Sequence, residues 1–290
     1  MSFTNVPMQA IADLPQGQIT DIECKLLYWL TSEIWSGKGA IVELGSLYGK
    51  STVCLARGMA ANAMAPAGKT GKLHAFDKWL VDDENAFMLK QLGKGYRGSF
   101  KRIFEDNTDS LKDWIVAHEG DVFDAKWTHG PIEILFIDCS ISKEFHEMVF
   151  KKFFPFLRRG SIVIQQDYFF YRSYYLPLMM GKLQQFLTEK VNADTSMMYQ
   201  AEVSIPVSMF AKPLADSDKE IALSLEARIK HYGGIASPHG GIIGAMLVYF
   251  YTLRGNAQKA EEWSERIRRE NKYSAGNPVY RNLNNALAAV

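Results

Sequence analysis

Acidic residues end several short apolar runs of the chain, and the first of these acids is followed by a glycine-bearing loop. Residues 41–52 read IVELGSLYGKST, so an apolar run contains Glu43 near its end and small residues follow Gly49. This pattern predicts a strand, a tight loop and the start of a helix. Glycine has no Cβ and tolerates positive φ, so such a loop lets backbone N–H groups approach a ligand closely. The Glu43 carboxylate favours a ligand with a cationic or hydroxyl-rich part over a bare phosphate.

Three kinds of ligand-binding loop resemble residues 45–49. A nucleotide P-loop has four residues between its glycines, whereas three lie between Gly45 and Gly49 here. Lys50 and Ser51 match the end of a P-loop, but the missing residue would remove part of the backbone nest that binds the anion. A dinucleotide loop needs a glycine where this chain has Leu47. The pattern acid-x-Gly-x-x-x-Gly fits as written. An ordinary turn between strand and helix is the simplest alternative for the loop taken alone.

Further acids follow the later apolar runs. A single acid in such a place is usually a turn residue or a helix cap. Acids at most successive strand ends are harder to explain in this way, because like charges that converge on one edge repel unless a ligand or cation binds them. In open parallel sheets, ligands bind beyond the carboxyl ends of the strands. We therefore expect one shared site for Glu43, Asp77, Asp121, Asp138 and Asp167.

The elements that must position these acids alternate between strand and helix, which predicts an α/β fold with a parallel sheet and covered faces. Strands are expected at 40–44, 72–76, 114–118, 132–137 and 161–165, and helices at 21–35, 51–64, 83–92 and 142–157.

The second half of the chain is expected to add a helix at 175–191, paired strands at 196–203 and 207–212, and helices at 216–232, 242–253 and 257–271. Two glycine pairs bracket a predicted flexible loop that holds His239. The expected organisation is an N-terminal helical extension (1–36), an α/β domain (37–213) and a C-terminal helical subdomain (214–290).

Composition excludes several classes of partner. The 290 residues carry a net charge of +1, so no basic excess points to nucleic acid. No apolar run reaches transmembrane length, and no signal peptide opens the chain, so we expect a cytoplasmic protein without a membrane partner. The three cysteines lie in or beside apolar runs, which predicts reduced core thiols rather than disulfides: Cys24, Cys54 and Cys139.

The order of five segments resembles a known family. They are VELGSLYGKST at 42–52, AFDKW at 75–79, EGD at 119–121, LFID at 135–138 and GSIVIQQDY at 160–168. Together they resemble class I S-adenosylmethionine-dependent methyltransferases, and among these the macrocin- and cephalosporin-type O-methyltransferases of small-molecule biosynthesis. The resemblance covers roughly residues 37–213. It implies a Rossmann-like, mostly parallel seven-stranded sheet with helices on both faces, plus a C-terminal helical extension.

The resemblance implies roles for individual residues toward S-adenosylmethionine. Glu43 would lie near the ammonium group, Asp77 would bind both ribose hydroxyls, and Asp121 would face the adenine amino group. Trp79 either stacks near the adenine or belongs to the core, and a turn aspartate is an equal alternative for Asp121. The full set implied to contact the cofactor is Glu43, Gly45, Ser46, Leu47, Tyr48, Gly49, Ser51, Thr52, Asp77, Trp79, Asp121 and Asp138.

Many members of the family add Mg²⁺, which lowers the pKa of the acceptor hydroxyl. They hold it with an acid after the fourth strand and an acid pair after the fifth. Asp138 and Asp167 match, but Gln166 replaces the first member of the pair and removes one charge. Ser140 and Ile141 stand where relatives often have another acid or a histidine. The resemblance therefore implies Asp138, Gln166 and Asp167 as metal ligands and leaves open whether a metal is needed.

Three residues are the candidate catalytic groups: Asp138, Asp167 and His239. His239 is expected either in a lid over the site or in a plain solvent loop. The aromatic residues 168–175 either line an acceptor pocket or pack against the sheet.

The sequence thus predicts methyl transfer from S-adenosylmethionine to a hydroxyl of a small metabolite, such as a sugar or natural-product intermediate. A homo-oligomer formed through the N- or C-terminal helices is expected. The alternatives are a non-catalytic nucleoside-binding or assembly protein, which Gln166 favours slightly, and a P-loop NTPase.

Overall fold

The computed structural model describes residues 2–63, 72–81, 90–93, 95–139, 142–211, 217–271 and 276–288. The chain forms two compact units, one of residues 1–139 and 156–164 and the other of residues 140–155 and 165–290. The boundaries predicted after residues 36 and 213 stay predictions. Most of the helix predicted at 83–92 lies outside the described residues, as do Ser140 and Ile141.

Four parallel strands form the centre of the first unit. β1 (Ala40–Leu44) lies between β2 (Leu73–Asp77) and β6 (Ile132–Ile137), and β5 (Ile115–Glu119) pairs with β2. Every residue of β1 is buried, as its continuous apolar character predicts for a strand with both faces covered. The strands at 40–44 and 132–137 have the predicted bounds.

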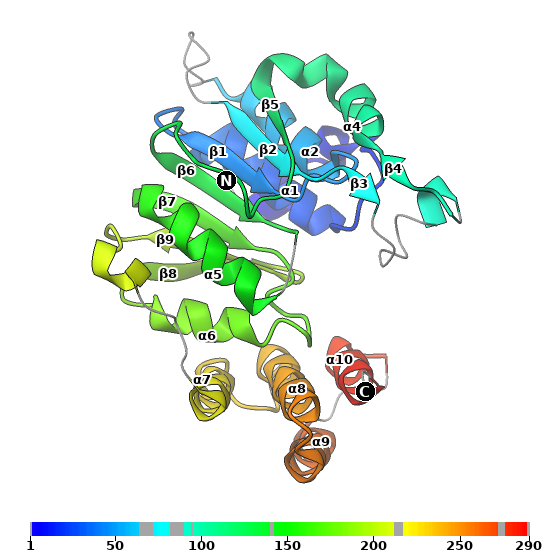
Figure 1. Ribbon diagram of the computed structural model, residues 1–290, viewed down its shortest axis with the longest axis vertical. Coiled ribbons are helices and arrows are strands. Elements are labelled where there is room, and N and C mark those ends of the chain that lie inside the picture. The colour runs from blue at the N-terminus through cyan, green and yellow to red at the C-terminus, as the bar shows by residue number, and fades with distance from the viewer. Residues whose placement is uncertain are drawn as a thin grey trace. The chain divides into compact units, whose positions relative to one another are not determined.

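Three further strands complete the sheet. They are β7 (Leu157–Gln165), β8 (Leu187–Ala193) and β9 (Ser196–Ala201), and the last two pair in antiparallel fashion. The order of all seven is β5-β2-β1-β6-β7-β9-β8 (Figure 1). The predicted Rossmann-like fold, with a mostly parallel seven-stranded sheet, helices and a C-terminal helical region, is confirmed.

Helices before and after β1 pack against each other in the first unit. α1 (Asp21–Trp29) continues into the π-helix η3 (Leu30–Ile34), and α2 (Lys50–Ala61) contacts both. Just after α2, the side-chain amide of Asn62 donates to the carbonyl oxygen of Thr31 at 2.8 Å. This bond ties the end of α2 to η3.

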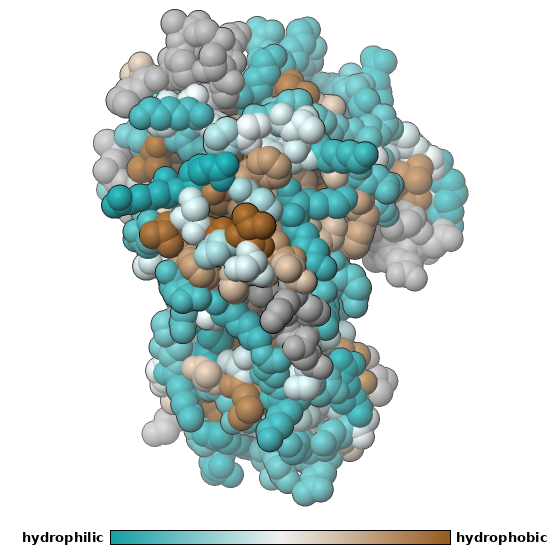
Figure 2. Space-filling model, turned by 60° about the vertical axis from the view of Figure 1, so that its left-hand side comes forward, coloured by the Kyte–Doolittle hydropathy of each residue, from teal (hydrophilic) through white to brown (hydrophobic). Residues whose placement is uncertain are grey.

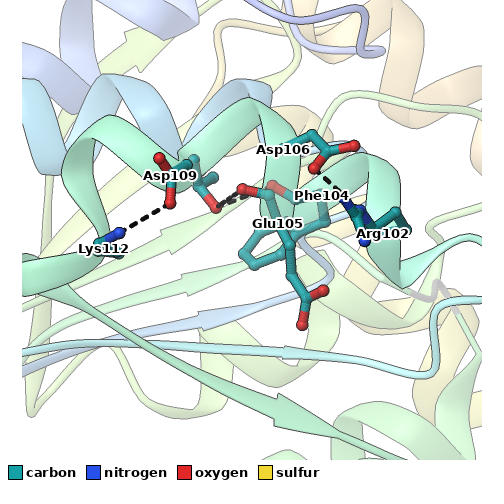
Figure 3. A network of polar contacts seen from close by, with 7 residues as sticks. Arg102, Phe104, Glu105, Asp106, Asp109 and Lys112 are labelled. Carbon is teal, nitrogen blue, oxygen red and sulfur yellow. Dashed lines mark hydrogen bonds and ion pairs between the residues drawn. The ribbon is translucent and has the colours of Figure 1, made fainter.

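Residues 101–114 form α4 (Lys101–Thr108) and, directly after it, the 3-10 helix η4 (Asp109–Trp114). Exposed ion pairs lie along both, and each contributes little to stability because water screens it. Figure 3 shows two of them, Arg102–Asp106 and Lys112–Asp109. The short elements of this unit are η1 (Phe3–Asn5), η2 (Met8–Ile11), β3 (Leu80–Val81) and β4 (Gly98–Ser99).

The second unit ends in a group of helices around α8 (Pro238–Leu253), visible in yellow to red in Figure 1. α8 is apolar on all sides, which is typical of a buried helix. Its neighbours are α7 (Asp218–His231), α9 (Ala257–Glu270) and α10 (Pro278–Ala288), and each of them contacts it. α10 was not anticipated from the sequence, although Val279, Leu283 and Ala286 bury a helical stripe.

The helix predicted at 142–157 is shorter than expected. α5 (Lys143–Lys152) is followed by the 3-10 helix η5 (Phe154–Phe156), and β7 begins at residue 157 instead of 161. Pro155 explains the early end of α5, because it has no backbone N–H with which to continue the α-helical hydrogen bonds.

The prediction for residues 175–212 is partly wrong. α6 (Tyr175–Lys182) is the first half of the predicted helix, but residues 187–193 form β8. β9 pairs with β8, and residues 207–211 form the 3-10 helix η6 (Val207–Ala211) instead of the predicted partner strand. Short runs of this kind fit either a helix or a strand, and here pairing with the adjacent β9 decides for a strand.

The cysteines follow the prediction in part. Cys24 and Cys54 are buried free thiols, whereas Cys139 is free but exposed and corrects the expectation of a core thiol. Over the described ranges, no helix has both the length and the apolar character to cross a bilayer. Hydrophilic residues cover most of the face seen in Figure 2.

Candidate functional site

Backbone hydrogen bonds join the segments that follow four strands of the first unit. The N–H of Gly45 donates to the Phe76 carbonyl at 2.9 Å, and the N–H of Gly120 donates to the Asp77 carbonyl at 3.0 Å. The N–H of Asp138 donates to the last carbonyl of β1 at 2.8 Å. The strand ends therefore meet at one edge of the sheet. The segments at this edge carry four of the acids singled out in the sequence: Glu43, Asp77, Asp121 and Asp138.

Glycines allow the loop after β1 to turn against its neighbours. Gly45 and Gly49 have φ values of +95° and +93°. A Cβ on Gly45 would lie 2.1 Å from the carbonyl oxygen of Asp138, and one on Gly49 would lie 3.0 Å from a methyl carbon of Thr108. Leu47 also has positive φ, which costs about 1–3 kcal/mol for a residue with a side chain. The surroundings must hold this strained loop in place.

Asp77, the last residue of β2, holds the loop. Its Oδ2 accepts the N–H groups of Ser46 at 3.0 Å and Leu47 at 2.8 Å, and its Oδ1 accepts that of Trp79 at 2.7 Å. Burial raises the pKa of Asp77, and these three N–H groups act in the opposite direction by stabilising the carboxylate. The residue therefore fixes both the loop after β1 and the turn after β2.

This arrangement limits how Asp77 can bind a ligand. A carboxylate has about four lone-pair positions, and the chain's own N–H groups occupy three of them. One position on Oδ1 stays available for a ligand hydroxyl. A second hydroxyl on Oδ2 would compete with the N–H groups of Ser46 and Leu47, so the predicted bidentate contact couples ligand binding to the loop.

Glu43 lies beneath the loop and is fully buried. Its Oε2 accepts the hydroxyl of Thr52 at 2.6 Å, and among the described residues its Oε1 has no partner at hydrogen-bond distance. Burial raises the pKa of Glu43 to about 7, although the nearby hydroxyls of Ser51, Thr52 and Ser46 lower it. In this structure Glu43 supports the start of α2. Its predicted contact with an ammonium group stays a prediction.

An aromatic cluster supports the loop from the other side. Trp79 and Tyr48 are buried with Phe104 of α4, and the Trp79 indole N–H donates to the Leu47 carbonyl at 3.0 Å. Trp79 thus occupies the core position that the sequence left as an alternative to adenine stacking. The amide of Asn107 donates to the Tyr48 carbonyl at 2.8 Å. The sequence analysis did not identify Asn107, because nothing in its local pattern indicates a contact with a residue as distant in sequence as Tyr48.

Lys50 makes a P-loop improbable on geometric grounds. In a P-loop, the lysine of Gly-Lys-Ser reaches the phosphates. Here the Lys50 ammonium donates to the carbonyl of Ile19 at 2.6 Å, and its stem lies against Gly17. The side chain is therefore engaged by the N-terminal segment, and the spacing of the glycines is one residue too short.

Asp121 has the geometry of a turn aspartate. Its Oδ1 accepts the N–H of Phe123 at 2.9 Å, and its Oδ2 pairs with the ammonium of Lys78 at 2.9 Å. This supports the turn alternative and leaves contact with an adenine as a prediction.

The predicted metal ligands belong to different units. Asp138 lies in the first unit, whereas Gln166 and Asp167 lie in the second. Gln166 is buried and its amide donates to the Thr195 hydroxyl at 3.5 Å, and Asp167 has a φ of +57°. The magnesium site and the catalytic roles of Asp138 and Asp167 stay predictions.

His239 does not lie in a loop, which corrects the prediction. It is in the first turn of α8, which starts at Pro238 because the Ser237 hydroxyl accepts the N–H of Gly240 at 3.0 Å. Its ring stacks on Phe169 with centroids 4.1 Å apart, and burial lowers its pKa. A lid carrying His239 is therefore not present in this form, and its catalytic role stays a prediction. Most of the neighbouring aromatics pack as core residues: Tyr168, Phe169 and Tyr175.

We expect Gly45→Ala to destabilise the first unit by well over the 1–3 kcal/mol of backbone strain, because its Cβ meets a backbone carbonyl. Gly160→Ala is the matched control, since Gly160 has a φ of +90° and no atom within 4 Å of the added Cβ. Denaturant unfolding measures both. Equal losses of stability for the two variants would show that the loop can move away from Asp138.

We expect Glu43→Gln to change how stability depends on pH. The pKa of about 7 exceeds the ordinary 4.5, so the folded state binds this proton more tightly than the unfolded chain. The contribution of Glu43 to the parent's stability should therefore fall between pH 4.5 and 7 by on the order of 3 kcal/mol, against an opposite contribution from His74, whose pKa is lowered. That fall should be absent in Glu43→Gln but present in the control Glu105→Gln, which removes an exposed carboxylate. Unfolding at pH 5 and pH 8 tests this, and parallel curves for parent and Glu43→Gln would contradict it.

Comparison with known proteins connects this geometry to a family. Residues 42–168 match a family model described as a methyltransferase domain. The match starts inside β1 and ends just after β7, so it contains the loop, Asp77, Asp121, Asp138 and Asp167. No curated protein matches the chain in sequence.

Solved structures with a related fold share little sequence. CalS11, a TDP-rhamnose 3'-O-methyltransferase in calicheamicin biosynthesis, is 17% identical over 68% of this chain and 89% of its own, with a TM-score of 0.45. The O-methyltransferase NovP is 12% identical over 62% and 79%, with a TM-score of 0.48. A putative O-methyltransferase from Klebsiella pneumoniae is 15% identical over 69% and 93%, with a TM-score of 0.43.

Likeness at this level adds nothing about the activity, so the assignment depends on the family model and on the fold. The strand order, the glycine loop after β1 and the acid that ends β2 all lie within the matched segment. Residues 42–168 therefore match a methyltransferase domain.

Proposed function

We propose that the protein transfers a methyl group from S-adenosylmethionine to a hydroxyl group of a small metabolite. The observation that carries this proposal is the Asp77 carboxylate, which three backbone N–H groups hold in one orientation beside the glycine loop. The motif order that resembles small-molecule O-methyltransferases favours a hydroxyl acceptor, such as that of a sugar or a natural-product intermediate.

The residues of the site fit this cofactor. A nucleoside presents vicinal hydroxyls, which a fixed carboxylate can accept, and Asp77 keeps a position on Oδ1 for one of them. A second hydroxyl would displace an N–H group of the loop residues Ser46 or Leu47. The close packing of Gly45 against the Asp138 carbonyl brings the loop to the same strand edge. Asp77 and the loop would therefore hold the nucleoside and amino-acid parts of the cofactor.

When bound, S-adenosylmethionine supplies a methyl group on a sulfonium, which is already a strong electrophile. The protein must align the acceptor oxygen with the methyl carbon and accept the hydroxyl proton as the oxygen–carbon bond forms and the carbon–sulfur bond breaks. We propose Asp138, Asp167 and His239 as the candidate bases. His239 is suited to accept a proton because burial lowers its pKa and keeps the imidazole neutral near pH 7.

We expect Asp77→Ala to weaken binding of S-adenosylmethionine by about 100-fold or more, since it removes both the hydroxyl acceptor and the anchor of the loop. The matched control is Asp124→Ala, which removes an exposed aspartate from the same unit. Isothermal titration calorimetry measures both variants. Parental affinity in a folded Asp77→Ala variant would overturn the cofactor assignment.

We propose that Mg²⁺ assists the reaction through Asp138, Gln166 and Asp167. Enzyme treated with a chelator and desalted should lose methyl transfer by roughly tenfold or more, and added Mg²⁺ should restore it where Zn²⁺ does not. Transfer of labelled methyl groups into a mixture of metabolites provides the measurement. Unchanged transfer after exhaustive chelation would remove these three residues from the role of metal ligands.

A further inference from the structure

Three histidines far apart in the sequence meet in the first unit. One imidazole nitrogen from each of His74, His118 and His129 lies within 4.8 Å of the other two. His74 belongs to β2 and His118 to β5, while His129 lies in the segment that joins β5 to β6. None of them takes part in the site built around Asp77.

The strands fix the positions of two of these side chains. Phe76 pairs with His118 across the parallel strands, so the two lie on the same face of the sheet, and His74 shares that face because it is two residues before Phe76. Ala75, which alternates with them, faces the aromatic cluster under the glycine loop instead. The histidines therefore lie on the face opposite to that cluster.

A turn brings the third histidine to the other two. The indole N–H of Trp127 donates to the Gly130 carbonyl at 2.7 Å, which closes the turn that carries His129. Trp127 is buried and its ring meets His74 edge-on at 4.9 Å, and the rings of His129 and His74 are 4.6 Å apart. The turn is thus packed onto the strands, with His129 exposed at its tip and His74 buried.

The distances are close to those of a metal centre. Nδ1 of His74 and Nε2 of His118 are 2.8 Å apart. Tetrahedral Zn²⁺ with bonds of about 2.0–2.1 Å to nitrogen would separate two ligand atoms by about 3.3 Å. The nitrogen atoms of His74 and His118 would need to separate slightly, and that of the exposed His129 would need to approach by up to about 1.5 Å.

The chemical state of the histidines suits a metal. Burial lowers the pKa of His74 to about 4, with His118, His129 and Lys72 adding to the effect, and burial and His129 lower the pKa of His118. Neutral imidazoles present the lone pairs that transition metals bind. Three histidines with one open position form a known ligand set for Zn²⁺.

We propose that His74, His118 and His129 bind one divalent transition-metal ion, such as Zn²⁺, with water in the fourth position. The ion fastens the segment after β5 to the buried strand β2. Because that segment begins at Gly120, whose N–H donates to the Asp77 carbonyl, the metal also steadies the end of the strand that carries Asp77. This site is separate from the predicted magnesium ligands and does not depend on the proposed reaction.

The test uses the full chain, stripped of metal and without a polyhistidine tag. Calorimetric titration with Zn²⁺ should show one site of micromolar or tighter affinity, and thermal unfolding should shift to higher temperature with Zn²⁺. His118→Gln and His129→Gln should each weaken binding at least tenfold and reduce that shift. His231→Gln is the matched control, since His231 is exposed on α7 beside Glu189, and it should bind Zn²⁺ as the parent does.

Other results would overturn the proposal. Binding that needs millimolar Zn²⁺, or that survives His129→Gln and His118→Gln unchanged, would show that the cluster is only a hydrogen-bonded group of stacked aromatic rings. His118 and His129 are chosen because both are more exposed than His74, and circular dichroism of each variant checks that it is folded. Titration with S-adenosylmethionine on the same samples keeps the outcome separate from that of the proposed function.

Discussion

The hydrogen bonds from the loop after β1 to the carboxylate of Asp77 are the interaction on which the candidate site depends. They join β1 to β2, which are neighbours in the sheet although 29 positions separate the end of β1 from the start of β2. Without them, the strained Leu47 and the buried N–H groups of Ser46 and Leu47 would lose their anchor. The same carboxylate is the best candidate to accept a ligand hydroxyl. Under the proposed function, this one side chain links loop conformation to cofactor binding.

The acids at the strand ends have different surroundings, which resolves the repulsion that their spacing suggests. Glu43 is buried with a raised pKa, so it can be neutral near pH 7. Asp77 is surrounded by N–H groups, and Asp121 pairs with Lys78. The carboxylates at the strand ends therefore have three different roles. Glu43 supports the start of a helix, Asp77 anchors a loop and Asp121 closes a turn.

Local patterns predicted the strands of the first half of the chain well, and in the second half they predicted α7, α9, most of α8 and β9 but missed β8 and misplaced His239. β1 and β6 have the predicted bounds because their runs are short and mainly apolar, and a glycine follows β1 while an acid follows β6. β8 was missed because residues 187–193 alternate weakly and find their partner only through the turn to β9. His239 was misplaced because flanking glycines suggested a loop, whereas Ser237 and Pro238 start a helix. The three clustered histidines gave no local signal, since strand register brings His74 and His118 together and a turn adds His129.

The central claim is that Asp77 and the loop at residues 45–49 hold S-adenosylmethionine. A crystal structure of the protein with this cofactor tests the claim most directly. We expect a ribose hydroxyl on Oδ1 of Asp77, the second hydroxyl in competition with the loop N–H groups, and the amino-acid part over Gly45 and Gly49. A cofactor bound elsewhere, with Asp77 still bonded only to Ser46, Leu47 and Trp79, would contradict it.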